Sequence, residues 1–417
     1  MVKDMLGRNE AVSADRALDI LLNLPLNNKP SLEVPVEEAY GRVLSCDITS
    51  PENMPVFSRS AMDGFAVRAS DTFGCSESVP AYLRLNGYVK MGEAPDVTAG
   101  PGDAVSIPTG GMLPEGADAV VMLENVQQTG DDMIEVMRPV APGENVIAAG
   151  EDIRERDYVL RRGIVLRPQD IAALAGLGIT RVKIYKKPLV SIISTGDEIV
   201  PPQSHPGFGQ VRDINSFNLA GLVMNTGGIP EKFGIFPDEY NVLRDAICRA
   251  VESTDVVLIS GGSSVGTRDM TAALIESMQK GGTLFHGVAV KPGKPLIGGF
   301  VRGVPVFGLP GHPAAVTVSF HNFVEPVIKK IGGVDLQIER NRPAAVSARL
   351  VKNISSAPGR EDYIRVSLYE EGGELCAEPV FGKSGLISTL VRADGMVMIP
   401  SHAQGIPRGE MVKVRIF

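Results

Sequence analysis

The spacing of apolar positions changes along the chain and separates regions of different structure. Residues 13–24 place apolar side chains on one helical stripe behind Ser13, which predicts a short amphipathic helix capped by that serine. From residue 31 to about 165, short apolar runs alternate with Gly, Pro and Asp at the roughly 8–12-residue spacing of barrels and sandwiches. We therefore expect a β-rich region, followed by a short helix at 167–178. Its predicted strands include residues 82–85, 104–107, 119–123 and 133–136.

Beyond Pro188 the pattern changes to alternating strands and helices. Short apolar runs occur at 189–194, 234–236, 256–260 and 304–308. Helical patterns lie at 216–225, 239–252, 270–279 and 314–330. This alternation predicts a doubly wound, mostly parallel α/β sheet with helices on both faces. After residue 333 the pattern returns to short strands as far as Phe417.

Composition narrows the classes of protein that this chain can represent. The 417 residues correspond to roughly three domains. A net charge of −8 disfavours a general nucleic-acid binder, which needs a basic surface. The longest uncharged apolar stretch, at about 171–179, is far shorter than the roughly 20 residues of a membrane helix. Charged residues before any apolar run argue against a signal peptide, and four scattered cysteines suit a reducing compartment. We expect a cytoplasmic protein with neither a membrane nor a nucleic acid as partner.

Each predicted strand of the α/β region is followed by a polar loop. The loops read TGDE at 195–198, PD at 237–238, SGGSSVGTRD at 260–269 and GLPGHP at 308–313. Ligands on open α/β sheets bind at the carboxyl ends of strands, where glycines expose backbone amides and helix N-termini attract anions. Four such loops predict an anion site at one sheet edge. The candidate binding residues in these loops are Gly261, Gly262, Ser264, Gly266, Pro310 and Gly311.

Charged residues near these loops add two further predictions. Lys291 and Lys294 lie in KPGKP at 291–295, a stiff loop that holds two cations near an anion or, alternatively, forms a solvated turn. Glu198, Asp238 and Asp269 follow strands that end at the same edge. Carboxylates beside an anionic ligand require a hard divalent cation, and oxygen ligands suit magnesium. Taken singly, each of these carboxylates also fits a helix cap or a turn.

The β-rich region contains three short motifs that are ambiguous by themselves. Asp63-Gly64 lies in SRSAMDGFA at 58–66, between predicted strands, where it fits an ordinary hairpin turn. PTGG at 108–111 and GED at 150–152 are equally open to a turn interpretation.

In combination, the motifs resemble the molybdopterin molybdotransferase family, which includes bacterial MoeA and the C-terminal domain of gephyrin. The resemblance covers essentially the whole chain, with six short signatures in a fixed order. They are SAMDGFAVR at 60–68, PTG through PEGADAVV at 108–121, STGDE at 194–198, and the loops at 261–269, 291–295 and 308–313. The chain departs from the family at His312, where Asn is usual, and at Ser263, where Val or Thr is usual.

The resemblance implies a multidomain fold and a homodimer. An N-terminal helix at 1–30 would pack on the body, and an elongated linking β-rich domain would comprise 31–49 and 153–186. A second β-rich domain would span 50–152. The α/β domain at 187–333 would be similar to molybdopterin adenylyltransferases, and a C-terminal β-barrel would span 334–417.

The resemblance also implies a reaction: insertion of molybdate into adenylylated molybdopterin, with release of AMP and with Mg²⁺ as cofactor. Three alternatives stay open, namely a gephyrin-type scaffold, a molybdopterin adenylyltransferase and a tungstate-inserting enzyme. A transient contact with the adenylyltransferase would deliver the substrate. The residues that the family motifs place in catalysis are Asp63, Glu198, Asp238 and Asp269, the last three also as metal ligands. Those that they place in substrate binding, beyond the loop residues above, are Thr109, Asp152, Lys291 and Lys294, with weaker matches at Arg360 and Ser384.

Overall fold

The chain folds into two compact units. The computed structural model describes residues 11–130, 132–261, 265–278, 280–338 and 345–417, with the backbone alone for residues 265–269. One unit, here the α/β unit, comprises Met1–Cys46, Arg162–Arg167 and Arg181–Phe417. The other, here the β-rich unit, comprises Asp47–Arg161 and Pro168–Thr180. The finer domain boundaries expected from the sequence stay predictions.

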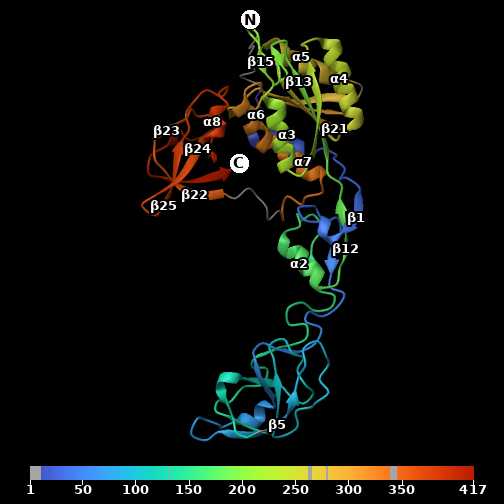
Figure 1. Ribbon diagram of the computed structural model, residues 1–417. Helices are drawn as coiled ribbons and strands as arrows, with labels where there is room; N and C mark the ends of the chain where they lie inside the picture. Colours follow the sequence, from blue (N-terminus) through green and yellow to red (C-terminus); the bar gives the residue numbers. More distant parts are fainter. Residues whose placement is uncertain (1–10, 131, 262–264, 279, 339–344) are drawn as a thin grey trace. The chain divides into compact units, whose positions relative to one another are not determined.

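A mixed sheet forms the centre of the α/β unit (Figure 1). Its strand order is β16-β13-β17-β21-β20-β18, and the first four strands run parallel. Strands β20 and β18 are antiparallel additions that the apolar pattern did not reveal. The strands are β13 (Leu189–Thr195), β16 (Ile229–Phe236), β17 (Val256–Gly261), β18 (Gly281–His286), β20 (Ile297–Val301) and β21 (Val304–Leu309).

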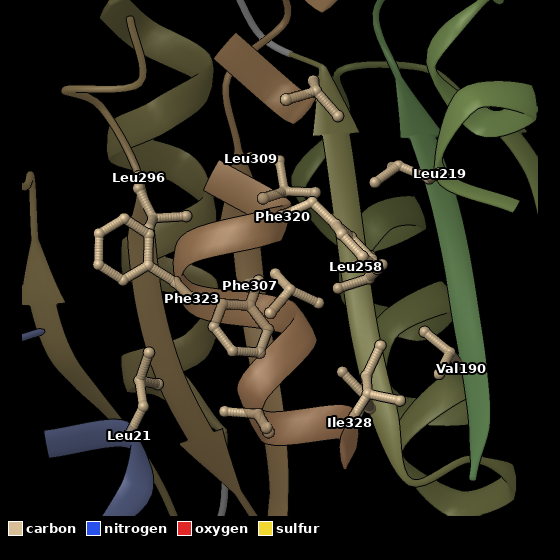
Figure 2. Packing of buried hydrophobic residues seen from close by; sticks show 14 of the residues in the cluster. Leu21, Val190, Leu219, Leu258, Leu296, Phe307, Leu309, Phe320, Phe323 and Ile328 are labelled. Atoms are coloured by element: carbon tan, nitrogen blue, oxygen red, sulfur yellow. The ribbon is translucent and has the colours of Figure 1, made fainter. Parts of the chain in front are cut away.

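Helices cover both faces of this sheet, which confirms the doubly wound prediction. In β17, Val256 and Leu258 join one buried cluster, while Val257 and Ile259 join another, because alternate side chains point to opposite faces. Figure 2 shows Leu258 of the first cluster among Phe307, Phe320 and other apolar side chains. The helices of the first cluster are α1 (Ala14–Leu22), α3 (Asn215–Asn225), α6 (Pro313–Ser319) and α7 (Glu325–Ile331), and those of the second are α4 (Tyr240–Ser253) and α5 (Val265–Ser277).

Two helices differ in detail from the sequence prediction. Ser13 caps α1 as expected, because its hydroxyl oxygen accepts a hydrogen bond from the amide of Arg16 at 3.2 Å. The helix expected at 314–330 is instead divided by a π-helical turn at Phe320–Val324. Pro326 has no amide hydrogen to donate to the preceding turn, so a regular α-helix cannot run through this point.

The C-terminal strands form a closed barrel, as predicted. Its strand order is β24-β25-β22-β28-β26, and β24 also pairs with β26 to close it. A short strand of the α/β domain, β19 (Val290–Lys291), pairs in parallel with β24 and so joins the KPGKP loop to the barrel. The barrel strands are β22 (Ala345–Leu350), β24 (Glu361–Glu371), β25 (Glu374–Pro379), β26 (Gly395–Ile399) and β28 (Met411–Ile416).

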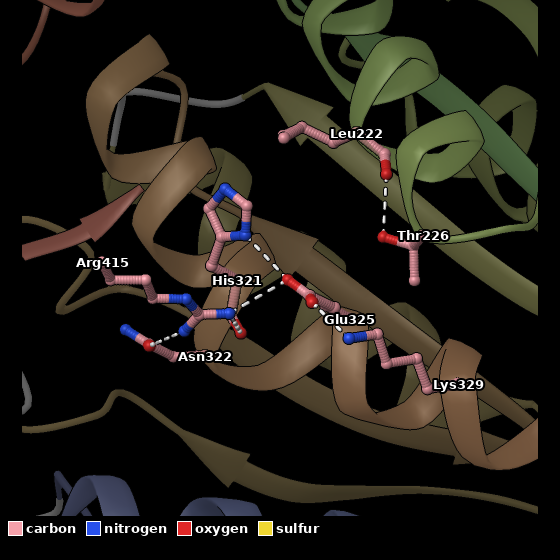
Figure 3. A network of polar contacts seen from close by, with 7 residues as sticks. All are labelled: Leu222, Thr226, His321, Asn322, Glu325, Lys329 and Arg415. Carbon is pink, nitrogen blue, oxygen red and sulfur yellow. Dashed lines mark hydrogen bonds and ion pairs between the residues drawn. The ribbon is translucent and has the colours of Figure 1, made fainter. Parts of the chain in front are cut away.

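A buried ionic network fastens the barrel to α7 (Figure 3). Glu325 accepts hydrogen bonds from His321 Nδ1 at 2.7 Å and Arg415 Nη2 at 3.1 Å, and pairs with Lys329 Nζ at 2.9 Å. Burial opposes the charged carboxylate, but these partners outweigh it and lower the pKa of Glu325 to about 2. Since Arg415 lies in the last barrel strand, the network ties the chain terminus to the α/β domain.

The β-rich unit contains a sheet of order β7-β4-β6-β5-β9-β8. Its strands are β4 (Gly64–Val67), β5 (Ala81–Tyr88), β6 (Asp103–Ile107), β7 (Ala119–Met122), β8 (Val126–Gln128) and β9 (Met133–Val136). Two-stranded pairs join β3 (Arg59–Ser60) to β10 (Val146–Ile147) and β2 (Ile48–Thr49) to β11 (Tyr158–Leu160). The helix α2 (Pro168–Gly176) also belongs to this unit.

Further short pairs lie in the α/β unit. They join β1 (Ser31–Pro35) to β12 (Arg181–Tyr185), β14 (Ile199–Val200) to β15 (Val211–Arg212), and β23 (Ile354–Ser355) to β27 (Gly405–Ile406), while α8 (Ser388–Val391) follows β25. Within the described parts of the chain, no helix is long and apolar enough to cross a membrane.

Candidate active site

The parallel strands bring the predicted loops to one edge of the α/β sheet. The neighbouring strands β16, β13, β17 and β21 share one direction, so their carboxyl ends form a row. Asp238 follows the first strand, Glu198 the second, Gly261 ends the third and Pro310 follows the fourth. The row thus runs from an acidic end at β16 and β13 to a glycine- and proline-rich end at β21.

The acidic end is a group of three carboxylates, here the acidic cluster, consisting of Asp197, Glu198 and Asp238. Asp238 Oδ1 accepts a hydrogen bond from the hydroxyl of Thr195 at 2.6 Å. The amide of Asp238 donates to Asp197 Oδ1 at 3.2 Å. These bonds fix the loop after β16 against the loop after β13.

The acidic cluster raises the pKa of the Asp238 carboxyl. Partial burial is the largest cause, and the negative charges of Asp197 and Glu198 act in the same direction, whereas the Thr195 hydrogen bond opposes them. Ionised Asp238 is therefore held at a free-energy cost that a bound cation would relieve. Among the described side chains, no three potential ligands are already arranged as a metal site. The side chain of Asp269 lies outside that described set.

The middle of the row requires glycine. A Cβ at Gly261 would lie 1.8 Å from the carbonyl oxygen of Thr195, and its φ of +154° is unfavourable for other residues. Glycine thus allows β17 to end against the TGDE loop. The predicted residues Gly262 and Ser264 lie outside the described residues, while Gly266 and Asp269 are placed by backbone alone in the first turns of α5.

The other end of the row opens into a pocket of about 670 Å³, here the basic pocket. Its walls come from the KPGKP loop, the GLPGHP loop and the barrel. They include six residues predicted to bind substrate, namely Lys291, Lys294, Pro310, Gly311, Arg360 and Ser384. Arg365 and Lys383 add two further cations to the lining. The structure therefore brings together the predicted lysines and the weakly matched barrel residues.

Hydrogen bonds join the GLPGHP loop to the barrel at the rim of this pocket. His312 Nδ1 lies 3.0 Å from the hydroxyl oxygen of Ser384, and the amide of Ala314 donates to the Ser384 carbonyl at 3.2 Å. The first amides of a helix have no partner within it, so Ser384 satisfies one at the start of α6. Asn215 Nδ2 donates to the Gly311 carbonyl at 2.9 Å and supports the same loop from α3.

In the β-rich unit, the structure brings Asp63 together with Thr109. Asp63 Oδ1 accepts hydrogen bonds from the Thr109 amide at 2.7 Å and from its hydroxyl at 2.9 Å. These two bonds lower the pKa of the exposed Asp63 carboxyl, the amide being the larger cause. Asp152 is also exposed, and its amide donates to the Met54 carbonyl at 3.2 Å.

Comparison with known proteins identifies the family. Three family models match in order: the MoeA N-terminal region (domain I and II) at residues 12–178, the "Probable molybdopterin binding domain" at 191–330, and the MoeA C-terminal region (domain IV) at 347–417. The molybdopterin molybdenumtransferase of Haemophilus influenzae is 35% identical over 384 residues, covering 92% of this chain and 93% of that protein. The molybdopterin molybdenumtransferase of Bacillus subtilis is 31% identical, covering 91% and 88%.

The chain belongs to the MoeA family. A crystal structure of the Pyrococcus horikoshii molybdopterin biosynthesis moeA protein has a TM-score of 0.85 and 35% identity, covering 98% of this chain and all of that one. The match to the whole chain agrees with the family resemblance seen in the motifs and with the arrangement of α/β domain and barrel.

The candidate site includes residues to which the sequence assigned no individual role. Thr195 belongs to the TGDE loop, but its hydrogen bond to Asp238 appears only when β16 brings Asp238 beside it. Asp362, at the start of β24, pairs with Arg360 at 2.9 Å, although an isolated aspartate in a strand carries no sequence signal. His312 stands where the family usually has Asn, and its partner Ser384 lies 72 positions away in the chain.

Proposed function

We propose that this MoeA family member is a molybdopterin molybdenumtransferase, which inserts molybdate into adenylylated molybdopterin and releases AMP. The observation that carries this proposal is the pairing of a basic pocket with an acidic cluster along one sheet edge. The substrates are a doubly charged oxyanion and a pyrophosphate-linked nucleotide, so the reaction mainly requires that several anions be held together. The pocket cations and the carboxylates divide that task.

The basic pocket supplies the anion-binding half of the site. Lys291, Lys294 and Arg360 present cationic groups from two different domains. Hydrolysis of the phosphoanhydride bond needs a water molecule in line with the bond that breaks. Positioning therefore contributes more than a strong base would.

The acidic cluster suits a divalent cation, which we propose is Mg²⁺. Asp238 and Glu198 offer oxygen ligands, and partial burial, together with the charges of Asp197 and Glu198, raises the pKa of Asp238. Asp269 would complete the set from α5. The cation, when bound, would stabilise the negative charge that develops on the departing AMP.

We further propose that the protein acts as a homodimer and that Asp63 completes the site of the partner subunit. Asp63 and Thr109 belong to a separate compact unit, and the family resemblance implies a site shared across a two-fold interface. A transient contact with the molybdopterin adenylyltransferase would supply the adenylylated substrate.

The direct test is AMP release from adenylylated molybdopterin by the purified protein. We expect release to require molybdate and to stop when EDTA removes divalent cations. Lys291→Ala and Lys294→Ala should each weaken substrate binding by about 1.5–3 kcal/mol, the usual contribution of a charge-assisted bond, with little change in melting temperature. AMP release that EDTA leaves unchanged would contradict the metal role.

The same assay separates the alternative functions. An adenylyltransferase would consume ATP and form the adenylylated pterin, while a scaffold would bind the pterin without releasing AMP. Tungstate in place of molybdate, at equal concentration, measures which oxyanion the site prefers.

Mixing two inactive variants tests the shared site. Random pairing of Asp63→Asn and Asp269→Asn chains makes half of the dimers mixed, each with one intact site, so about a quarter of wild-type activity should return. If both residues served a site within one chain, mixing would restore nothing even though subunit exchange is complete.

A further inference from the structure

Asp362 is a buried carboxylate directly beneath the cationic side chains of the basic pocket. It is 1% exposed, and its Oδ1 accepts a hydrogen bond from Arg360 Nε at 2.9 Å. Its Oδ2 lies 3.8 Å from Lys291 Nζ and has no hydrogen-bond donor among the described residues. A buried anion is costly unless partners compensate it, so Asp362 needs both Arg360 and Lys291 close to its carboxylate.

The two cations reach Asp362 from different domains. Arg360 directly precedes β24 of the barrel. Lys291 lies in β19, which pairs with β24 so that Lys291 is opposite Asp362. The side chains of Arg360 and Lys291 are 37% and 59% exposed, and both line the basic pocket. Asp362 therefore contacts two pocket cations without lining the pocket itself.

The hydrogen-bond geometry of arginine explains how one carboxylate can orient a ligand-binding group. A guanidinium carries one donor at Nε and four at its terminal nitrogens, all in one plane. Because Asp362 takes the Nε donor, the plane of Arg360 is held while the terminal donors stay free of that bond. Such fixing lowers the entropy lost when an anion binds.

We propose that Asp362 is a positioning residue of the proposed molybdenumtransferase, which orients Arg360 and Lys291 toward a pyrophosphate group in the basic pocket. This proposal rests on the proposed function for the identity of the substrate, but not for the binding of an anion. It makes a prediction opposite in sign to simple electrostatics. Removing a negative charge near the pocket should by itself tighten anion binding, whereas loss of positioning should weaken it.

The experiment measures the dissociation constant of inorganic pyrophosphate by calorimetry in metal-free buffer with EDTA. We expect Asp362→Asn to raise it about 10-fold, as for other residues that support a ligand-binding shell. In an Arg360→Ala background, the same substitution should change it by about 2-fold or less, because the directly hydrogen-bonded partner is gone and only the 3.8 Å contact to Lys291 remains. In AMP release, Asp362→Asn should raise KM for adenylylated molybdopterin and leave kcat nearly unchanged.

Glu374→Gln is the matched control. It removes one negative charge from the same barrel and breaks an exposed pair, in which Arg349 contacts Glu374 at 2.6 and 2.8 Å. Glu374 does not line the basic pocket, so pyrophosphate binding should stay as in the wild type. Arg360→Lys provides a second variant at a more exposed position. It keeps the charge but loses the planar group, and we expect about the same loss of binding as for Asp362→Asn.

Each result decides the proposal. Pyrophosphate binding that is equal or tighter in Asp362→Asn overturns it, and so does an equal loss with and without Arg360. If Asp362→Asn does not fold, wild-type binding by Arg360→Lys overturns it instead. A wild-type protein that binds pyrophosphate but releases no AMP would refute the proposed function. The dissociation constants of the variants would then still decide whether Asp362 positions the pocket cations.

Discussion

Two aspartates predicted to be catalytic each accept a hydrogen bond from a threonine, yet their pKa values are shifted in opposite directions. Asp63 accepts two hydrogen bonds from Thr109 on an exposed surface, and its pKa is lowered. Asp238 accepts one from Thr195, and its pKa is raised. The hydrogen-bond partner is the same residue type, so the difference comes from the surroundings.

Burial and neighbouring charge explain that difference. Asp238 is half-buried and lies near Asp197 and Glu198, which disfavour another negative charge. At Asp63 the desolvation cost is the smallest of the causes, and the Thr109 amide dominates. Asp63 is thus a stabilised anion, whereas Asp238 is a strained one that favours a proton or a metal ion. Asp63 is therefore suited to remain a negative charge, and Asp238 to attract a cation.

The largest expected effect comes from neutralising each aspartate. Asp63→Asn and Asp238→Asn should each reduce AMP release by about 100-fold or more, the scale seen when a charged contact to a reacting group is lost. Their melting temperatures should move differently. Asp238→Asn relieves repulsion and should raise the melting temperature at pH 7 by about 1–3 °C, whereas Asp63→Asn should lower it slightly. Calorimetry of both metal-free variants checks this, and equal shifts would remove the basis of the comparison.

The pH dependence of stability gives the next largest contrast. The lowered pKa of Asp63 contributes stability above its unfolded-state pKa near 3.8, and this contribution is lost as the pH falls through the folded value. The raised pKa of Asp238 has the opposite sign, since its cost is present above the folded pKa and vanishes as the pH falls below 3.8. Urea unfolding between pH 3 and 7, with each Asn variant as reference, measures the two slopes.

A smaller effect is expected when Thr195 is replaced. Thr195→Val removes the one hydrogen bond that lowers the pKa of Asp238, so that pKa should rise further and Mg²⁺ should bind less well at low pH. Carboxyl carbon NMR of the metal-free protein reports the titration. A pKa that falls in this variant would show that Thr195 does not stabilise the ionised form.

Glu198→Gln should lower the pKa of Asp238, and by less than Thr195→Val raises it. The charge of Glu198 is the last of the causes that affect Asp238, and its removal should lower the Asp238 pKa modestly. The same NMR titration serves here. Asp245→Asn, on the exposed surface of α4, is a charge-matched control that should leave it unchanged.

The smallest effect belongs to Thr109. Thr109→Val removes the hydroxyl but keeps the backbone amide, which is the larger cause of the low Asp63 pKa. We expect a slight rise in that pKa and nearly normal stability. If the pKa of Asp63 rises more in Thr109→Val than the pKa of Asp238 rises in Thr195→Val, the Thr109 hydroxyl and not its amide would be the larger cause at Asp63.

Local sequence was sufficient to predict the α/β architecture and much of the candidate site. Alternating apolar strands and amphipathic helices indicated the parallel sheet, since burial on two faces requires those patterns. In a parallel sheet the loops after successive strands share one edge, so TGDE, PD and GLPGHP could be placed together before the structure was known. The antiparallel strands β18 and β20 escaped prediction because the glycines within them weaken the apolar pattern.

Only the tertiary structure decided which of these groups touch and how their charges respond. The parallel pairing of β19 with β24 brings Lys291 beside Asp362, and the closed barrel brings Ser384 to His312. Thr195 meets Asp238 because β13 and β16 are neighbours, although 43 positions separate them in the chain. Residue type and order determine what a side chain is able to do. Its pKa and its partners depend on burial and on distances of a few ångströms, which packing between remote segments sets.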